Sequence, residues 1–328
     1  MASTTPLYVA SAEGALVEDA DGNEYVDISG ASGALLFGHN APCVREALLR
    51  MLDSSEFALG FEHALVGSNA RRLCRMVGLE RATFVNTGTE ATTLAARLAR
   101  LHRGRSRIVC FEGSYHGHYD GFLGTPSSSA ATLHECTPSS PGVSPAFIED
   151  LVVLQYDDES ALAYIIEHAD EIAAVFVEPV QAQTSLANAP RAFLRKLREL
   201  TRSHGIVMVF DEVVTGFRIA AGGAQAHFGV RADLVTYGKA LAGGLPIGAV
   251  AGSTKLMDGV DGGAWEYGDK SFPRTTRTYF AGTFCKFPLS SKLSRHSSAP
   301  PASHALPSAS HALPSPLPLP LPPASASA

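Results

Sequence analysis

Apolar runs alternate with helical patterns through the middle of this 328-residue chain. Helical spacing of apolar residues predicts an alanine- and leucine-rich helix that ends near Gly104, a helix over 159–171 and another over 190–205. Near-continuous apolar strands between such helices predict an α/β fold with a mostly parallel sheet covered on both faces. The predicted strands are 82–86, 107–113, 151–156, 173–180, 206–212 and 233–239.

Two other stretches have a different pattern. The first residues alternate in short runs around Asp21-Gly22-Asn23, which predicts a β-hairpin, and a helix is expected over 42–52 with Pro42 near its start. Residues 124–146 are rich in serine, proline and glycine, which predicts a long loop.

Composition narrows the classes of function. A formal net charge of −6 gives no basic field for nucleic acid, and no apolar run approaches the roughly 20 residues that span a bilayer. The N-terminus has no signal or transit pattern. Five scattered cysteines predict core thiols in a reducing compartment, without disulfides or a zinc site. The expectation is a cytoplasmic enzyme.

The end of the chain changes in composition. After about Ser290 only a few residue types remain, and SHALPS occurs twice. Such a tail is expected to be disordered or polyproline-like. A solvated tail and a proline-rich ligand for an SH3-like partner are the two interpretations.

Two of the predicted strands lead into segments that could hold a ligand. At Gly88 and Thr89 a strand turns into a helix, whose free amides could bind a phosphate, or Thr87 could act as a plain helix cap. Tyr115 and His116 lie between glycines, where a ring could stack on a flat ligand or simply pack on the domain. His116 and His118 alone are a weak metal set, and no metal site is expected.

Two charged residues also follow apolar strands. Asp211 ends the run IVMVFD, where it could face a protonated ring nitrogen or cap the next segment. Lys239 ends LVTYGK before a glycine-rich loop, and it is either an ordinary loop lysine or an amine that attacks an aldehyde. Together, an anion cradle, an aromatic ring, an acid and an amine at strand ends fit pyridoxal 5'-phosphate.

These motifs resemble a known family. NTGTEA, SYHGHYDG, VEPVQ, FDEVVTGFR, TYGKALAGGLPIGAVAG and YFAGTF are similar to class III (subgroup II) pyridoxal-phosphate-dependent aminotransferases over about residues 6–289. Within the class, the chain resembles glutamate-semialdehyde aminomutases. It is more similar still to the aminotransferase modules of polyketide and non-ribosomal peptide synthases, through AHFGVRADLVTYGK, DGGAWEYGDKSFP and FAGTFCKFPL.

The resemblance implies the type I (aspartate-aminotransferase-like) three-layer fold, a homodimer, and a small-molecule amino donor and carbonyl acceptor. It implies that Lys239 forms the Schiff base and that Asp211 pairs with the ring nitrogen. It further implies cofactor contacts by the remaining site residues: Gly88 and Thr89 at the phosphate, Val213 and Tyr115 on the two ring faces, His116 and Glu178 lining the site, and Thr283 at the phosphate of the neighbouring subunit.

The chain departs from the pattern in ways that keep other functions open. Ser32 replaces a tryptophan of the aminomutases and Gln183 replaces an asparagine, which favours transamination over aminomutase activity. The expected domains are 1–50 (part of a small domain), 51–289 (the large cofactor-binding domain) and the tail 290–328, in place of the C-terminal domain. The alternative to an active transaminase is a different class of function, namely a truncated, inactive remnant or a partner-binding protein.

Overall fold

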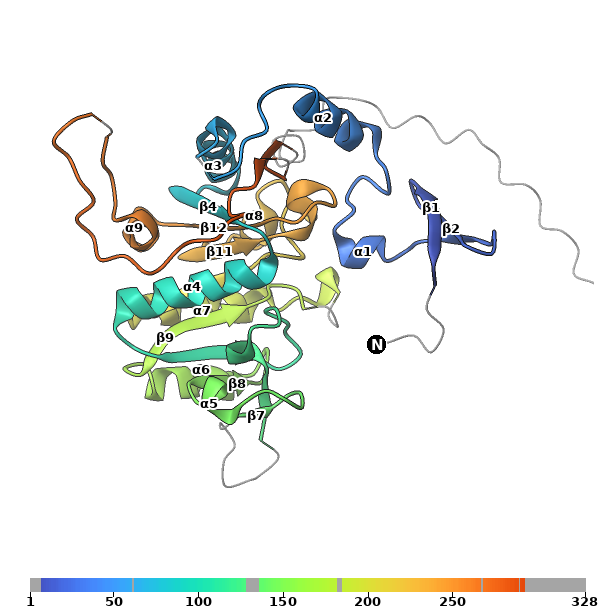
Figure 1. Cartoon of the computed structure of the whole chain (residues 1–328). Coiled ribbons are helices and arrows are strands. Elements are labelled where there is room, and N and C mark those ends of the chain that lie inside the picture. Colours follow the sequence, from blue (N-terminus) through green and yellow to red (C-terminus); the bar gives the residue numbers. More distant parts are fainter. Residues whose placement is uncertain are drawn as a thin grey trace, which may run out of the picture. The chain divides into compact units, whose positions relative to one another are not determined.

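The largest sheet of the chain has seven strands, in the order β4-β12-β11-β10-β9-β5-β8 (Figure 1). A computed structural model describes residues 7–60, 62–127, 136–181, 185–266, 268–288 and 290–292. The strands are β4 (Arg81–Val85), β5 (Arg107–Phe111), β8 (Leu151–Leu154), β9 (Ile172–Val177), β10 (Val207–Asp211), β11 (Leu234–Tyr237) and β12 (Gly248–Gly252). Only β12 runs antiparallel to its neighbours among these seven, so the predicted mostly parallel sheet is confirmed.

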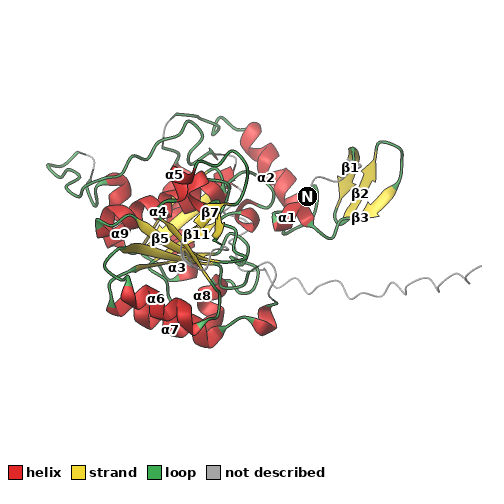
Figure 2. Ribbon diagram, turned by 90° about the horizontal axis from the view of Figure 1, so that it is seen from below, coloured by secondary structure: helices red, strands yellow, loops and turns green. Residues whose placement is uncertain are grey.

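Helices cover both faces of this sheet. Figure 2 shows α4 and α9 on one side, and α6 and α7 on the other. The helices that pack on the sheet are α3 (Ala64–Val77), α4 (Gly88–Arg103), α6 (Glu159–Glu167), α7 (Arg191–Ser203), α8 (Gly223–Phe228) and α9 (Thr254–Asp261). Within the described ranges, none of the helices is long and apolar enough to cross a bilayer.

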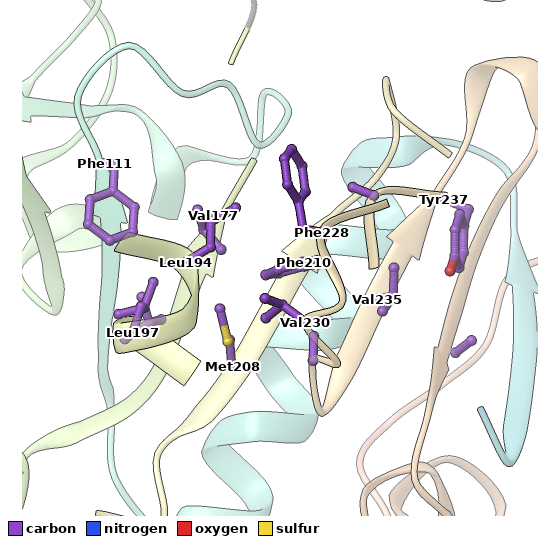
Figure 3. Packing of buried hydrophobic residues seen from close by; sticks show 14 of the residues in the cluster. Phe111, Val177, Leu194, Leu197, Met208, Phe210, Phe228, Val230, Val235 and Tyr237 are labelled. Atoms are coloured by element: carbon purple, nitrogen blue, oxygen red, sulfur yellow. The ribbon is translucent and has the colours of Figure 1, made fainter. Parts of the chain in front are cut away.

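Strand alternation divides the core into two clusters. On β10, Met208 and Phe210 join the cluster under α7, while Val207 and Val209 join the cluster under α4. Successive side chains of a strand point to opposite faces, so an apolar strand fills both layers. Figure 3 shows the α7 side, where Leu194 and Leu197 lie near Val177 of β9 and Met208 of β10, and the same layer continues to Val235 and Tyr237 of β11.

The N-terminal segment forms a small antiparallel sheet of β1 (Val9–Glu13), β2 (Leu16–Asp19) and β3 (Glu24–Val26). The predicted hairpin around Asp21–Asn23 joins β2 to β3 and is confirmed. The element labelled α1 (Gly30–Gly33) follows, and it is a single left-handed turn rather than a regular helix. The helix α2 (Pro42–Leu52) has the predicted bounds.

The interpretation of 124–146 as a long loop is wrong in part. β6 (Gly124–Pro126) pairs with β7 (Cys136–Pro138), and α5 (Pro145–Ile148) follows. This ribbon lies against β8, the edge strand, and Gly124 permits the close approach, since a Cβ there would lie 2.8 Å from Leu151. Residues 128–135 of this segment, and the tail beyond 292, lie outside the described residues.

The cysteines are all free, as expected for a chain without disulfides. Cys74 and Cys110 are buried, and burial raises the pKa of the Cys74 thiol. Cys43 is exposed, so the prediction of core thiols is wrong for this residue.

Candidate active site

Five parallel strands end at one edge of the sheet and bring most of the predicted site residues together. β4 and β5 lead to Gly88 and His116, and β9, β10 and β11 lead to Glu178, Asp211 and Lys239. Ligands of parallel sheets bind at the carboxyl ends of the strands. Here these ends surround a cavity of about 170 Å³ lined by Gly88, Thr89, Thr92, Tyr115, His116, Gly117, Glu178, Asp211, Val213, Val214 and Lys239.

The Asp211 carboxylate is buried and held by hydrogen bonds. Its Oδ1 accepts the Thr236 hydroxyl at 3.0 Å and the Val213 N–H at 3.1 Å, and its Oδ2 lies 2.7 Å from His116 Nδ1. A carboxylate has about four acceptor positions. Three are used here, so one acceptor position on Oδ2 remains for a donor in the cavity. The alternative of a helix cap does not apply, because turns rather than a helix follow Asp211.

His116 is the buried partner of that carboxylate. Its ring is wedged between Phe122 and Phe176, with ring centroids 5.5 and 5.6 Å away. With Nδ1 directed at Asp211, the imidazole donates its proton there, and Nε2 has no hydrogen-bond partner among the described residues. A buried nitrogen without a partner at a cavity wall is expected where a ligand or water completes the site.

Glu178 connects the ends of β9 and β5. It is 5% exposed, and its Oε2 accepts the backbone N–H of Tyr115 at 3.0 Å. Burial, and then the nearby charge of Asp211, raises the pKa of Glu178 to about 7. The Tyr115 ring is 61% exposed, so most of it remains available to a ligand in the cavity.

The start of α4 could hold an anion. The Thr87 hydroxyl accepts the Glu90 N–H at 3.1 Å, so Thr87 caps the helix and does not line the cavity. The cap interpretation therefore holds for Thr87, while Gly88 and Thr89 face the cavity with the helix N-terminus behind them. Gly117 must be glycine, because its φ is +92° and a Cβ would lie 2.5 Å from the Thr89 hydroxyl.

Lys239 lies outside the strand in which it was predicted. β11 ends at Tyr237, and Lys239 begins the 3-10 turn η3 (Lys239–Ala242) with φ at +42°. A non-glycine residue in the left-handed region costs about 1–3 kcal/mol and persists when its surroundings fix it. This backbone turn, which the strand pattern could not predict, leaves Lys239 on the cavity wall.

Val213 forms the floor between two glycines. Its methyl groups lie 3.1 Å from a Cβ built at Gly88, and 3.3 Å from one built at Gly238. Both distances are tighter than most Cβ contacts, so a side chain at Gly88 or Gly238 would press on Val213.

Thr283 does not join the other predicted site residues. It is exposed, in a turn of the segment 283–286, and does not line the cavity. His118 also separates from His116, since its Nδ1 lies 3.2 Å from the Thr89 hydroxyl. The two histidines thus contact different residues, His116 contacting Asp211 and His118 contacting Thr89.

Thr236 is a functional residue that sequence reasoning missed. It pairs with Asp211 in the register of β10 and β11, which places its hydroxyl beside the carboxylate. A polar residue in the apolar run LVTY was the available signal.

Glu212, next to the site, should make stability depend on pH. It is 1% exposed and accepts the N–H groups of Ala224 and Gln225 at the start of α8, and burial raises its pKa to about 7. Because the pKa in the folded state exceeds the ordinary value of 4.5, the contribution of Glu212 to stability is complete below about pH 4.5. It is lost as the pH rises through about 7.

We therefore expect Glu212→Gln to reduce the fall in unfolding free energy between pH 5 and pH 8, by up to about 3 kcal/mol relative to the unmodified chain. Urea unfolding at the two pH values measures this difference. Glu80→Gln is the matched control, because hydrogen bonds from Thr254 lower the pKa of Glu80 and its contribution is constant above pH 5. Equal slopes for the unmodified chain and Glu212→Gln would contradict the assignment.

The family follows from comparison of the whole sequence. Residues 1–286 match the pattern of the family described as aminotransferase class-III. The chain belongs to the class III aminotransferases. This membership confirms the predicted type I fold and pyridoxal phosphate as the cofactor of the class.

Two class III proteins illustrate the likeness. Glutamate-1-semialdehyde 2,1-aminomutase of Salinibacter ruber (strain DSM 13855 / M31) is 44% identical over 256 residues, which cover 77% of this chain and 58% of that protein. The crystal structure of an omega-transaminase from Sphaerobacter thermophilus has a TM-score of 0.81 and 34% identity, and the match covers 90% of this chain and 67% of that one. The chain thus spans well under two thirds of the length of the aminomutase.

A third relative was solved with a form of the cofactor. The glutamate-1-semialdehyde-aminomutase of Pseudomonas aeruginosa PAO1, in complex with PMP, has a TM-score of 0.77 and 26% identity; the match covers 90% of this chain and 64% of that one. The cavity of this class III chain fits pyridoxal phosphate. It offers a free acceptor position on Asp211, helix amides at Gly88 and Thr89, and one lysine amine.

Proposed function

We propose that this chain carries the cofactor site of a pyridoxal-phosphate-dependent aminotransferase, which moves an amino group from a donor to a keto or aldehyde acceptor. The observation that carries the proposal is the shared cavity of Lys239, the oriented Asp211 carboxylate and the N-terminus of α4. When bound, pyridoxal phosphate supplies a reactive aldehyde and an electron-withdrawing ring.

The N-terminus of α4 would hold the anionic end of the cofactor. Gly88 and Thr89 offer backbone amides where the helix dipole favours negative charge. Thr87 leaves these amides available, because its hydroxyl caps the helix through Glu90 instead. Thr89 is kept in place by His118, whose backbone N–H donates to the Thr89 hydroxyl at 3.3 Å.

Asp211 would favour a proton on the ring nitrogen of a bound cofactor. The Thr236 hydroxyl and the Val213 N–H fix Oδ1, and His116 fixes Oδ2, so the carboxylate is oriented before a ligand arrives. In a buried site, the negative charge favours the protonated form of a facing nitrogen. Val213 and the exposed Tyr115 would contact the two faces of a bound ring, and Glu178 holds the Tyr115 backbone.

Lys239 is the nucleophile and the proton carrier. With pyridoxal phosphate bound, its amine would hold the aldehyde carbon of the cofactor and, when free, would accept a proton from the α-carbon of the amino donor. Lys239 follows β11 with a left-handed backbone and lines the cavity. Of the described residues that line this cavity, Lys239 alone carries an amine.

Glutamate-semialdehyde aminomutase activity is the second candidate. The 44% identity to the Salinibacter ruber protein favours it, while the replacement of tryptophan by Ser32 does not. Ser32 is exposed, and Gln183, the other departure, lies outside the described residues. The likeness to synthase modules further suggests a β-keto acyl chain as the acceptor.

The proposal also includes the assembly and location expected for such an enzyme. A cytoplasmic homodimer would allow Thr283 of one subunit to approach the cofactor phosphate of the other, in keeping with its exposed position outside its own cavity. The division into domains at residues 50 and 289 stays a prediction.

A half-reaction screen tests the function. The purified chain with pyridoxal phosphate should show an absorbance band near the edge of the visible range, and an amino donor should remove it in one turnover. An acceptor should then restore the band. Conversion of glutamate semialdehyde without any second substrate would instead support the aminomutase, and the absence of a band would reject both functions.

A further inference from the structure

The segment after β3 contains a left-handed turn that is unusual for its composition. Four successive residues have positive φ, namely Gly30 at 51°, Ala31 at 54°, Ser32 at 55° and Gly33 at 83°. Alanine and serine avoid this region, because the Cβ crowds the following carbonyl oxygen. Such a turn persists when contacts from outside it fix its conformation.

One end of this turn is fixed by Asp27. Its Oδ1 accepts the N–H of Ser29 at 2.8 Å and of Gly30 at 3.0 Å, and its Oδ2 lies 2.8 Å from His39 Nε2. The hydrogen bonds from Ser29 and the His39 ring hold the pKa of Asp27 well below its usual range. This end is therefore held by its own segment.

The other end is fixed by Arg218, which belongs to the motif after β10. The guanidinium donates to the carbonyl oxygen of Gly33, and Nε donates to the carbonyl oxygen of Val214 at 3.1 Å. Val214 lines the cavity beside Asp211. Arg218 thus joins the turn 30–33 directly to the cavity wall.

The residues just after the turn pack on the loop that follows Lys239. A Cβ built at Gly244 would lie 2.8 Å from Leu35, and one built at Gly243 would lie 3.3 Å from Phe37. Both glycines have positive φ and directly follow η3. The segment 30–37 is therefore connected to two sides of the site. Arg218 links it to Val214, and Leu35 and Phe37 pack on residues 239–245, which we call the Lys239 loop.

We propose that Arg218 is a positioning residue of this site, which clamps the left-handed turn 30–33 so that segment 30–37 holds the Lys239 loop in the geometry that captures the cofactor. Arg218 does not line the cavity itself and acts through the turn. The proposal rests on the proposed function only in that capture by Lys239 is one of its two readouts. The other readout is the exchange of backbone amides.

The experiment compares Arg218→Ala, Arg218→Lys and Arg231→Ala with the unmodified chain, at a temperature well below unfolding. Arg231 is the matched control, because it is also an exposed arginine whose guanidinium donates to a backbone carbonyl, that of Gly78. The rate of pyridoxal phosphate capture is followed by absorbance. Hydrogen exchange is measured over 29–38 and 239–245.

For Arg218→Ala we expect amide exchange in both segments to accelerate about tenfold and capture to slow by about the same factor, as for the loss of a charge-assisted hydrogen bond. Arg218→Lys keeps a donor for the Gly33 carbonyl but loses the planar fork, so exchange and capture should each change by only about threefold. Arg231→Ala should change neither readout.

The proposal would be overturned if Arg218→Ala showed the same amide exchange in 239–245 and the same capture rate as the control Arg231→Ala. Faster exchange in 29–38 alone would also overturn it, because the turn would then be uncoupled from the Lys239 loop. If the unmodified chain captures no cofactor, the proposed function fails, while the exchange data still decide whether Arg218 holds the loop. If Arg218→Ala does not fold, Arg218→Lys decides, with an effect of about threefold expected.

Discussion

Lys239→Ala is expected to abolish covalent capture of pyridoxal phosphate and to lower any transaminase turnover by about 10⁴-fold or more, the scale seen when a nucleophile is removed. The reason is geometric. Lys239 provides the one amine on the described cavity wall, which it shares with Asp211 and the start of α4. After reduction with borohydride and proteolysis, mass spectrometry should find the cofactor on the peptide that contains Lys239, and on none in the variant.

The controls separate lost chemistry from lost structure. Lys239→Ala keeps a Cβ and hence a similar backbone preference, so its unfolding should stay close to that of the unmodified chain. Lys255→Ala removes an exposed lysine at the start of α9 and should leave capture unchanged. Cofactor fixed to another lysine in Lys239→Ala would show that the cavity has a different nucleophile.

The sequence predicted the sheet well because its signals are local. Apolar runs such as IVMVF are long enough to identify buried parallel strands, and Pro42 marks the start of α2. β12 was missed, since GAVAG consists of small residues and pairs antiparallel between β11 and β4. The small side chains there reflect the approach of α4, a tertiary contact that no local pattern contains.

The site was predictable as a set of residues but not as a geometry. Asp211 and Lys239 could be identified because a charge directly after an apolar strand is costly to bury unless it is paired or binds a ligand. The pairing of His116 Nδ1 with Asp211 joins residues 95 positions apart and depends on the order of the strands. The positive φ of Lys239 and the tether of Arg218 likewise arise from packing between segments distant in sequence.

Asp211→Asn is expected to separate cofactor binding from turnover. The side chain of Asp211 faces three donors, those of Val213, Thr236 and His116. Asparagine can accept two of these on its oxygen, and its amide can face His116 if the imidazole changes tautomer. The variant should therefore fold, losing about 1 kcal/mol of unfolding free energy.

The loss of negative charge has a larger effect on chemistry. Without the Asp211 anion, Glu178 is the one carboxylate left among the described cavity residues. It is a poor substitute, because it already accepts the Tyr115 N–H and burial raises its pKa to about 7. We expect turnover of the amino donor to fall about 10³-fold, as for other preorganised charges in a site that excludes water. Capture by Lys239 should remain within about tenfold, because the amine and the α4 amides are untouched.

Asp211→Ala distinguishes this electronic role from a purely structural one. It removes the acceptor of a buried histidine and leaves three donors unpaired, so unfolding free energy should fall by about 3–5 kcal/mol. If Asp211→Asn lost both capture and stability to the same extent as Asp211→Ala, the carboxylate would serve only to hold His116 and Thr236. Retained capture with lost turnover in Asp211→Asn would instead assign the negative charge, rather than the hydrogen bonds, to the chemistry of the amino transfer.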